Sequence, residues 1–229
     1  MMRLNEEFEM GLLKALRLRV TNAVFSAGTR TAMLAATVVA ALLSGCGAER
    51  PSKYYQLTIP GDVSGTQHAD PAPVTLLLGQ WLTSHLYRDD RIVYSSAGEE
   101  MGTYEYQRWA EPPAEMLEEV LLRELRASGR YRAVYTQRSN ANGDFLLRGR
   151  LYDLKEISGG AMQARVTFEV ELRDLKTGAT VWTHFYTHDE PVSGKDVANV
   201  VSALDKNVQR GIKEVVVGLD QYFISHPAK

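Results

Sequence analysis

The sequence predicts an α/β fold in a single domain: one mixed, largely antiparallel sheet with two main helices packed on one face. Two observations predict it. Short segments typical of strands dominate the chain after residue 54, and one amphipathic segment interrupts them while a longer one follows them. Helices gathered on one face of a mostly antiparallel sheet are the architecture that such an order favours.

The composition is that of a globular protein and excludes several other classes. The chain has 229 residues, of which 45% are hydrophobic and 24% charged, and its net charge is -2. A disordered chain or a protein of many membrane spans would depart from these fractions, and a nucleic-acid-binding surface would need a basic excess. The single cysteine excludes an internal disulfide and a cysteine-rich metal module. We therefore expect no nucleic-acid partner.

Residues 1–45 are predicted to be a lipoprotein signal peptide rather than part of the fold. Residues 32–43 form an apolar run that carries no charge. As a helix this run is about 18 Å long, too short for a hydrocarbon core of about 30 Å but suited to a secretory signal. Basic residues precede it. Three glutamates before Met10 are untypical of such a leader, which points to Met10 as the translation start.

The apolar run ends in Leu43-Ser44-Gly45-Cys46, which resembles the bacterial lipobox. Small side chains beside the scissile bond admit the peptidase, and the cysteine supplies the thiol that is acylated. The resemblance implies cleavage before Cys46, attachment of acyl chains, and, because Gly47 follows, sorting to the outer membrane. The alternative is a lone cysteine in an ordinary signal helix. Residues 46–53 would then be a tether and residues 54–225 the domain.

Strands are predicted where apolar and β-branched residues alternate or cluster between turn residues. The segment 164–175 alternates most cleanly, with an apolar face and a charged face, as a half-exposed antiparallel strand does. Residues 80–86 are predicted as one or two helical turns. The predicted strands are 54–59, 74–78, 91–95, 103–107, 131–136, 145–157, 164–175 and 180–188.

The first helix is predicted to begin after Pro112-Pro113, because proline suits a first helical turn, and to end at Gly129. The second is predicted from about Lys195 to Ser225, with Ser193 as candidate N-cap. Its apolar stripe steps by three or four residues, which predicts a helix against the sheet; a partner-facing surface is the alternative. The stripe consists of Val197, Val201, Leu204, Val208, Ile212, Val215, Leu219 and Tyr222.

No catalytic or metal-binding pattern is present in the sequence. His184 and His188 have the spacing of a zinc pair on a helix, but in a strand they lie about 13 Å apart, while zinc–nitrogen bonds are about 2.0–2.1 Å. Nucleophile-elbow, zinc-protease and phosphate-loop motifs do not occur. We therefore expect no enzyme, no metal and no cofactor. A periplasmic hydrolase, the weaker alternative, would need a paired nucleophile and base.

Several short stretches together resemble the ABC-type transport auxiliary lipoproteins, the PqiC-like group that accompanies MCE-type lipid transport. The resemblance covers most of residues 46–225 and is most specific at its tyrosine pair and at its arginine–tryptophan stretch. The stretches are Tyr54-Tyr55-Gln56-Leu57, Leu76–Leu78, Leu86–Val93 and Arg108-Trp109-Ala110-Glu111-Pro112.

This resemblance implies a non-catalytic component of a lipid transport system, anchored at the periplasmic face of the outer membrane and contributing to envelope integrity. It implies an MCE-domain protein and an ABC transporter as partners, and it makes a homo-oligomer an open expectation. Tyr54, Tyr55, Arg108 and Trp109 are candidates for partner or lipid contact, although burial is the alternative for Trp109. The alternative function is a structural lipoprotein that assists assembly of an outer-membrane complex or secretion pore.

Overall fold

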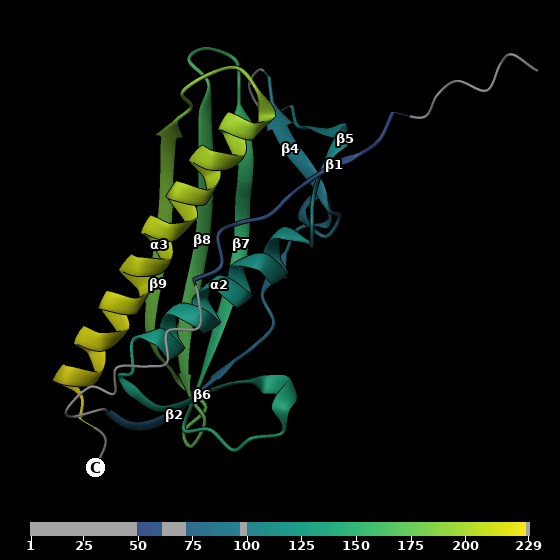
Figure 1. The fold of residues 1–229 in the computed structure, drawn as a ribbon. Coiled ribbons are helices and arrows are strands. Elements are labelled where there is room, and N and C mark those ends of the chain that lie inside the picture. The colour runs from purple at the N-terminus through teal and green to yellow at the C-terminus, as the bar shows by residue number, and fades with distance from the viewer. Residues whose placement is uncertain (1–49, 61–71, 97–99, 228–229) are drawn as a thin grey trace, which may run out of the picture. The chain divides into compact units, whose positions relative to one another are not determined.

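The computed structural model describes residues 50–60, 72–96 and 100–227. Cys46, the predicted signal peptide and most of the predicted tether lie outside these residues. The described part belongs, apart from Arg50, to one compact unit, Pro51–Lys229 (Figure 1). It contains a mixed sheet with two helices on one face, which confirms the predicted fold class.

The strands and helices follow the predicted order. Segments β4, β6 and β7 have the predicted bounds. The strands are β1 (Lys53–Tyr55), β2 (Ala72–Leu78), β3 (Leu82–Thr83), β4 (Arg91–Ser95), β5 (Gly102–Trp109), β6 (Tyr131–Thr136), β7 (Phe145–Ile157), β8 (Gln163–Asp174) and β9 (Thr180–Pro191). The helices are α2 (Pro113–Ala127) and α3 (Val197–Ser225), with 3-10 turns at His85–Tyr87 and Gln137–Ser139.

Strand β7 organises the sheet. Along one edge it pairs antiparallel with β8, and β8 pairs antiparallel with β9, so the three longest strands lie side by side (Figure 1). The other edge of β7 is shared end to end by β2, β3 and β4, each parallel to it. Strand β6 extends the sheet beyond β2, while β5 and then β1 extend it beyond β4. Because the shorter strands divide one edge among them, they fan out from a single long strand.

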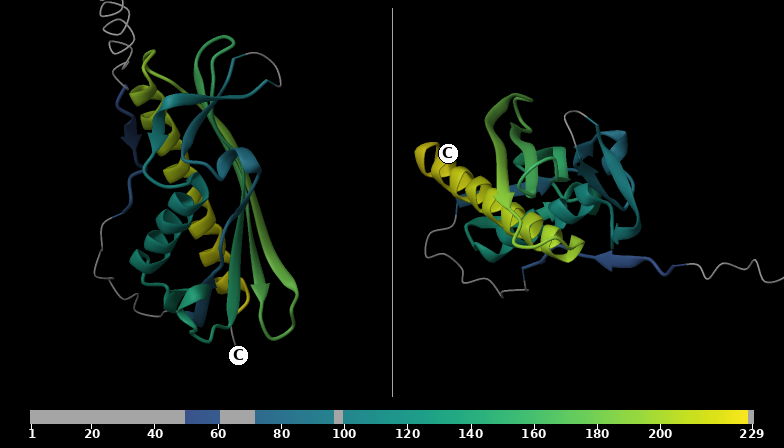
Figure 2. Two further views of the ribbon diagram at one scale, coloured as in Figure 1. Left: turned by 90° about the vertical axis from the view of Figure 1, so that its right-hand side faces the viewer. Right: turned by 90° about the horizontal axis from the view of Figure 1, so that it is seen from above.

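Both helices cover the same face of the sheet, with α3 over β8 and β9 and with α2 beside it over β6 and β7 (Figures 1 and 2). The predicted apolar stripe of α3 faces the sheet. Its residues Leu204, Val208 and Ile212 are fully buried. Opposite them, the alternate residues Val166, Phe168, Val170 and Leu172 of β8 are buried too, as the alternation predicts. Helix and strand thus bury matching apolar faces, which is the main source of stability in such a layer.

The first strand ends earlier than predicted. Residues 56–59 leave the sheet after Tyr55, and the chain turns toward α3. Thr58 explains the departure, because its N–H and its hydroxyl donate to the two carboxylate oxygens of Asp205 at 2.8 and 2.7 Å. Gln209 donates to the Thr58 carbonyl at 2.7 Å. Leu57 is buried between these contacts.

The predicted helical turns at 80–86 and the predicted N-cap at Ser193 are wrong. Leu82 and Thr83 instead pair with β7, and only His85–Tyr87 forms a 3-10 turn. Trp81 fixes this path, since its ring lies against Gly149, where a Cβ would come within 2.1 Å of it. Helix α3 begins at Val197, with Asp196 at the N-cap position and no side-chain capping bond.

Candidate functional site

The structure brings together the four described residues that the sequence predicts as contact residues. Strand β1 pairs in parallel with β5, which places Tyr54 opposite Arg108 and Tyr55 opposite Trp109. The Tyr55 carbonyl accepts a hydrogen bond from the N–H of Ala110 at 2.7 Å. We call Tyr54, Tyr55, Arg108 and Trp109 the β1 corner. The tyrosine pair and the Arg108–Trp109 pair are more than fifty positions apart in the chain, and the parallel pairing of β1 with β5 brings them together.

The members of the β1 corner differ in what they offer to a partner. Trp109 is fully buried, and its backbone N–H donates to the Asp90 carbonyl at 2.5 Å. Arg108 is held by Asp90 as well, with its guanidinium donating to the carboxylate at 2.6 Å. Tyr55 is half-buried and donates to the side chain of Gln107 at 3.0 Å. Tyr54 is 64% exposed. Of these four residues, Tyr54 therefore presents the most side-chain surface to solvent, while Trp109 and Arg108 hold the strands in place.

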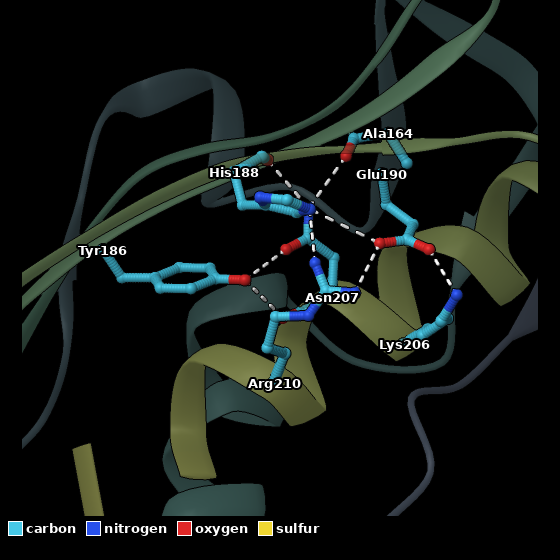
Figure 3. A network of polar contacts seen from close by, with 7 residues as sticks. All are labelled: Ala164, Tyr186, His188, Glu190, Lys206, Asn207 and Arg210. Carbon is cyan, nitrogen blue, oxygen red and sulfur yellow. Dashed lines mark hydrogen bonds and ion pairs between the residues drawn. The ribbon is translucent and has the colours of Figure 1, made fainter. Parts of the chain in front are cut away.

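A second group of polar residues fastens α3 to β9 (Figure 3). Glu190 of β9 is only 6% exposed, and it accepts hydrogen bonds from Lys206 at 2.5 Å and from Arg210 at 2.8 Å. His188 lies 3.5 Å from the same carboxylate and contacts Arg210. The hydrogen bond from Lys206 lowers the pKa of the Glu190 carboxyl, and the charge of Arg210 lowers it further. The carboxylate is thus held ionised.

Asn207 lies at the centre of this network and is fully buried. Its amide donates to the carbonyls of Ala164 and His188 at 2.9 and 2.8 Å, and its side-chain oxygen accepts from the Tyr186 hydroxyl at 2.6 Å. Burial raises the pKa of Tyr186 to about 12, so its hydroxyl stays a donor. Sequence analysis missed this network. Its signal is the alternation of Tyr186, His188 and Glu190 along one strand face.

Next to this network, β9 and α3 line a groove of about 640 Å³ that is largely open to solvent and that sequence analysis also missed. Trp182 and His184 form the wall on β9, their rings stacked at 5.9 Å with only 6° between the planes. Lys213, Val217 and Tyr222 line it from α3. We call this cavity the α3–β9 groove.

The face of the sheet that the helices leave uncovered carries a cross-strand row. In register, Leu82 of β3 lies beside Arg150, Arg150 beside Glu169, and Glu169 beside Phe185 of β9. Leu82 and Phe185 are 57% and 59% exposed. Tyr152 lies over this row, donating to Glu169 at 2.9 Å with its ring 6.1 Å from that of Phe185. The row is a mixed apolar and charged surface.

The described residues contain no group of three or more His, Cys, Asp or Glu side chains that could hold a metal ion. His184 and His188 lie on one face of β9, each beside a glutamate, Glu214 and Glu190 respectively. Within the described ranges, neither α2 nor α3 is long and apolar enough to cross a membrane.

The described residues form a helix-backed mixed sheet that follows a lipobox-like segment in the chain. Residues 55–216 match the family described as "ABC-type transport auxiliary lipoprotein component". The chain belongs to this family of lipoproteins, which act as auxiliary components of ABC-type transport. The match runs from the second tyrosine of the β1 corner to the last third of α3. The resemblance seen in the sequence is thereby confirmed.

Solved structures show the same fold. A protein of the family DUF330 from Xanthomonas campestris superposes with a TM-score of 0.66 at 20% identity, covering 76% of this chain and 99% of its own. An uncharacterised protein superposes with a TM-score of 0.59 at 13% identity, covering 74% of this chain and 99% of its own. No curated protein matches the chain.

Proposed function

We propose that the chain is a non-catalytic auxiliary component of an ABC/MCE-type lipid transport system, held at the periplasmic face of the outer membrane through Cys46 and contributing to envelope integrity. The family match over the folded domain carries this proposal. The lipobox-like segment just upstream of β1 supports it independently, because a lipoprotein auxiliary needs an acylation site before its first folded element.

Acylation at Cys46 would give a stable anchor. Each buried methylene contributes about 0.8 kcal/mol, and one chain alone binds only reversibly, whereas two or more chains together anchor a protein stably. Strand β1 begins at Lys53, seven residues after Cys46. Those residues reach at most about 25 Å when extended. The anchor would therefore keep the β1 corner, with exposed Tyr54, close to the bilayer, where a membrane-bound partner would meet it.

A non-catalytic role agrees with how the charged groups between α3 and β9 are arranged. Glu190, the buried carboxylate there, is neutralised by Lys206 and Arg210. A catalytic acid or base needs a pKa near the working pH, but the pKa of Glu190 is shifted the opposite way. The network therefore stabilises the packing of α3 on β9 and leaves no carboxylate ready for proton transfer.

The anchor is tested by metabolic labelling in the native host. Wild-type protein should incorporate labelled palmitate, and Cys46→Ser should incorporate none at equal protein abundance.

The transport role is tested by cross-linking wild-type cells and identifying captured proteins. An ABC permease, its ATPase and an MCE-domain protein are the expected partners. Capture of an outer-membrane barrel or secretion proteins instead would favour the assembly role. Tyr54→Ala should weaken the capture of these partners. Tyr135 is also an exposed tyrosine, on β6, so Tyr135→Ala is the matched control and should leave the capture unchanged.

A further inference from the structure

We propose that the α3–β9 groove binds one anionic phospholipid, with an acyl chain along the apolar part of the groove and the phosphate at Lys213. The assignment rests on the proposed function, because it names the ligand that an auxiliary lipid-transport component would hold. The groove is about 640 Å³, within the range of about 300–1,000 Å³ typical of small-molecule sites.

The apolar part of the groove lies toward the C-terminal end of α3. Val217 is 47% exposed there, and Tyr222 and Trp182 are half-buried. Gly218 lets the indole lie close to the helix, since a Cβ at this position would come within 2.9 Å of Trp182 Cζ2. The lining thus leaves apolar surface in contact with water, and each Å² of it that a ligand covers contributes about 25 cal/mol. An acyl chain would cover it.

The charged part of the groove lies toward the N-terminal end of α3, with Lys213 about one helical turn before Val217 and about two and a half turns before Tyr222. Lys213 has an exposed ammonium that forms no ion pair with any residue of the described ranges. Arg210 beside it adds positive charge, although its guanidinium is also bonded to Glu190. The one carboxylate in the lining, Glu214, faces His184 at 3.7 Å. Because Arg210 is bonded to Glu190 and Glu214 faces His184, Lys213 is the cation of the lining that is left to attract a negatively charged group.

The separation of these two parts identifies the occupant as an amphiphile. Lys213 and Tyr222 are nine residues apart, about 13.5 Å along the helix. One end of the groove therefore attracts an anionic group, and the other end contacts a hydrocarbon chain. A phospholipid has the same arrangement, with a charged phosphate at one end and acyl chains at the other. Strand β9 has a ladder partner on one side only among the described strands, so a chain would enter from the open edge of the sheet.

Site-specific photo-cross-linking tests this assignment in the native host with the full chain. Val217→p-benzoylphenylalanine places the photoreactive group in the groove. Ile224→p-benzoylphenylalanine is the matched control, because Ile224 is on the same helix, is 70% exposed and does not line the groove. After irradiation, mass spectrometry of the labelled peptide identifies the adduct. An anionic phospholipid adduct at position 217, at least about fivefold above position 224, is the expected result.

A charge reversal sharpens the test. In the Val217 cross-linking background, Lys213→Glu should reduce the adduct about fivefold or more, because it replaces an attraction by a repulsion. Lys195→Glu, an exposed lysine outside the groove, should change nothing. Equal labelling at positions 217 and 224, a free fatty acid or zwitterionic lipid, a peptide of this or another protein, or indifference to Lys213→Glu would each overturn the assignment. If the transport proteins are still captured in that case, only the groove assignment fails.

Discussion

Gly211 of α3 lies directly against the ring of Tyr186 on β9. A Cβ at position 211 would come within 2.8 Å of two ring carbons of Tyr186 and equally close to Phe168. The rings of Phe168 and Tyr186 stack at 5.1 Å beneath the helix, and both side chains are buried. The missing side chain of Gly211 thus sets how closely α3 approaches the sheet. The Tyr186 hydroxyl can then reach Asn207, one turn earlier on the helix.

Gly211→Ala is expected to destabilise the protein. Alanine normally favours a helix over glycine by about 1 kcal/mol. Here its methyl group collides with two buried rings, and overpacking of this kind costs about 1–3 kcal/mol. Gly218→Ala is the control, because its Cβ meets only the edge of half-buried Trp182. Urea unfolding should give a lower free energy of unfolding for Gly211→Ala than for Gly218→Ala. A stabilised Gly211→Ala protein would show that the contact is looser than described.

Asn207→Leu should cost about 3 kcal/mol of unfolding free energy. The change leaves the carbonyls of Ala164 and His188 and the hydroxyl of Tyr186 with fewer partners, and each unsatisfied buried group costs about 1–3 kcal/mol. Tyr186→Phe should cost less, about 1 kcal/mol, since Asn207 keeps its two carbonyl bonds. Denaturant unfolding of both variants measures the difference. Equal losses would mean that the tyrosine contact carries the network.

Acid should destabilise the protein partly through Glu190. The pKa of this carboxyl is lowered in the folded protein, so the group binds protons more readily when the chain is unfolded. Its stabilising contribution is therefore complete above the unfolded pKa, about 4.3, and is lost as the pH falls through the folded value. Glu190→Gln should reduce the loss of unfolding free energy between about pH 6 and about pH 3. An unchanged pH dependence would assign the acid sensitivity to other carboxylates, such as Asp189, whose pKa Arg165 lowers.

Two substitutions in the β1 corner should distinguish a residue that stabilises the fold from a residue that is exposed for contact with a partner. Trp109→Ala removes a fully buried indole and should cost about 3–5 kcal/mol. Tyr54→Ala removes a side chain that is 64% exposed, and its effect on stability should stay within about 0.5 kcal/mol. Thermal unfolding measures both. A large loss of stability in Tyr54→Ala would mean that Tyr54 supports the fold instead of offering a surface.

The sequence predicts those parts of the fold that depend on local periodicity. The two-residue period of β8 and the three-to-four-residue steps of α3 are set by which face each element buries, and the structure confirms both. The prediction of helical turns at residues 80–86 is wrong because the path of this segment depends on Trp81 packing on Gly149, a contact between residues far apart in the chain. The early end of β1 depends in the same way on Thr58 and Asp205, which are 147 residues apart.

The candidate sites were less accessible to sequence analysis than the fold. The motif resemblance proposed the four residues of the β1 corner as contact residues, and the parallel pairing of β1 with β5 that brings them together has no local signal. The α3–β9 groove depends on how far α3 lies from β9 at its C-terminal end, which the glycines decide. Side chains such as Lys213 and Val217 look like an ordinary solvated helix face until the strand beside them is placed.

The shared edge of β7 has a consequence for biogenesis. Strands β2, β3 and β4 pair with residues of β7 that follow them in the chain by 62 to 69 positions. The half of the chain that is synthesised first therefore lacks the β7 edge until the later half arrives, although β4 can already pair with β5, whereas β7, β8 and β9 are successive hairpins that close by short-range contacts. The parallel pairings of β2, β3 and β4 are therefore expected to form only after β7 is in place.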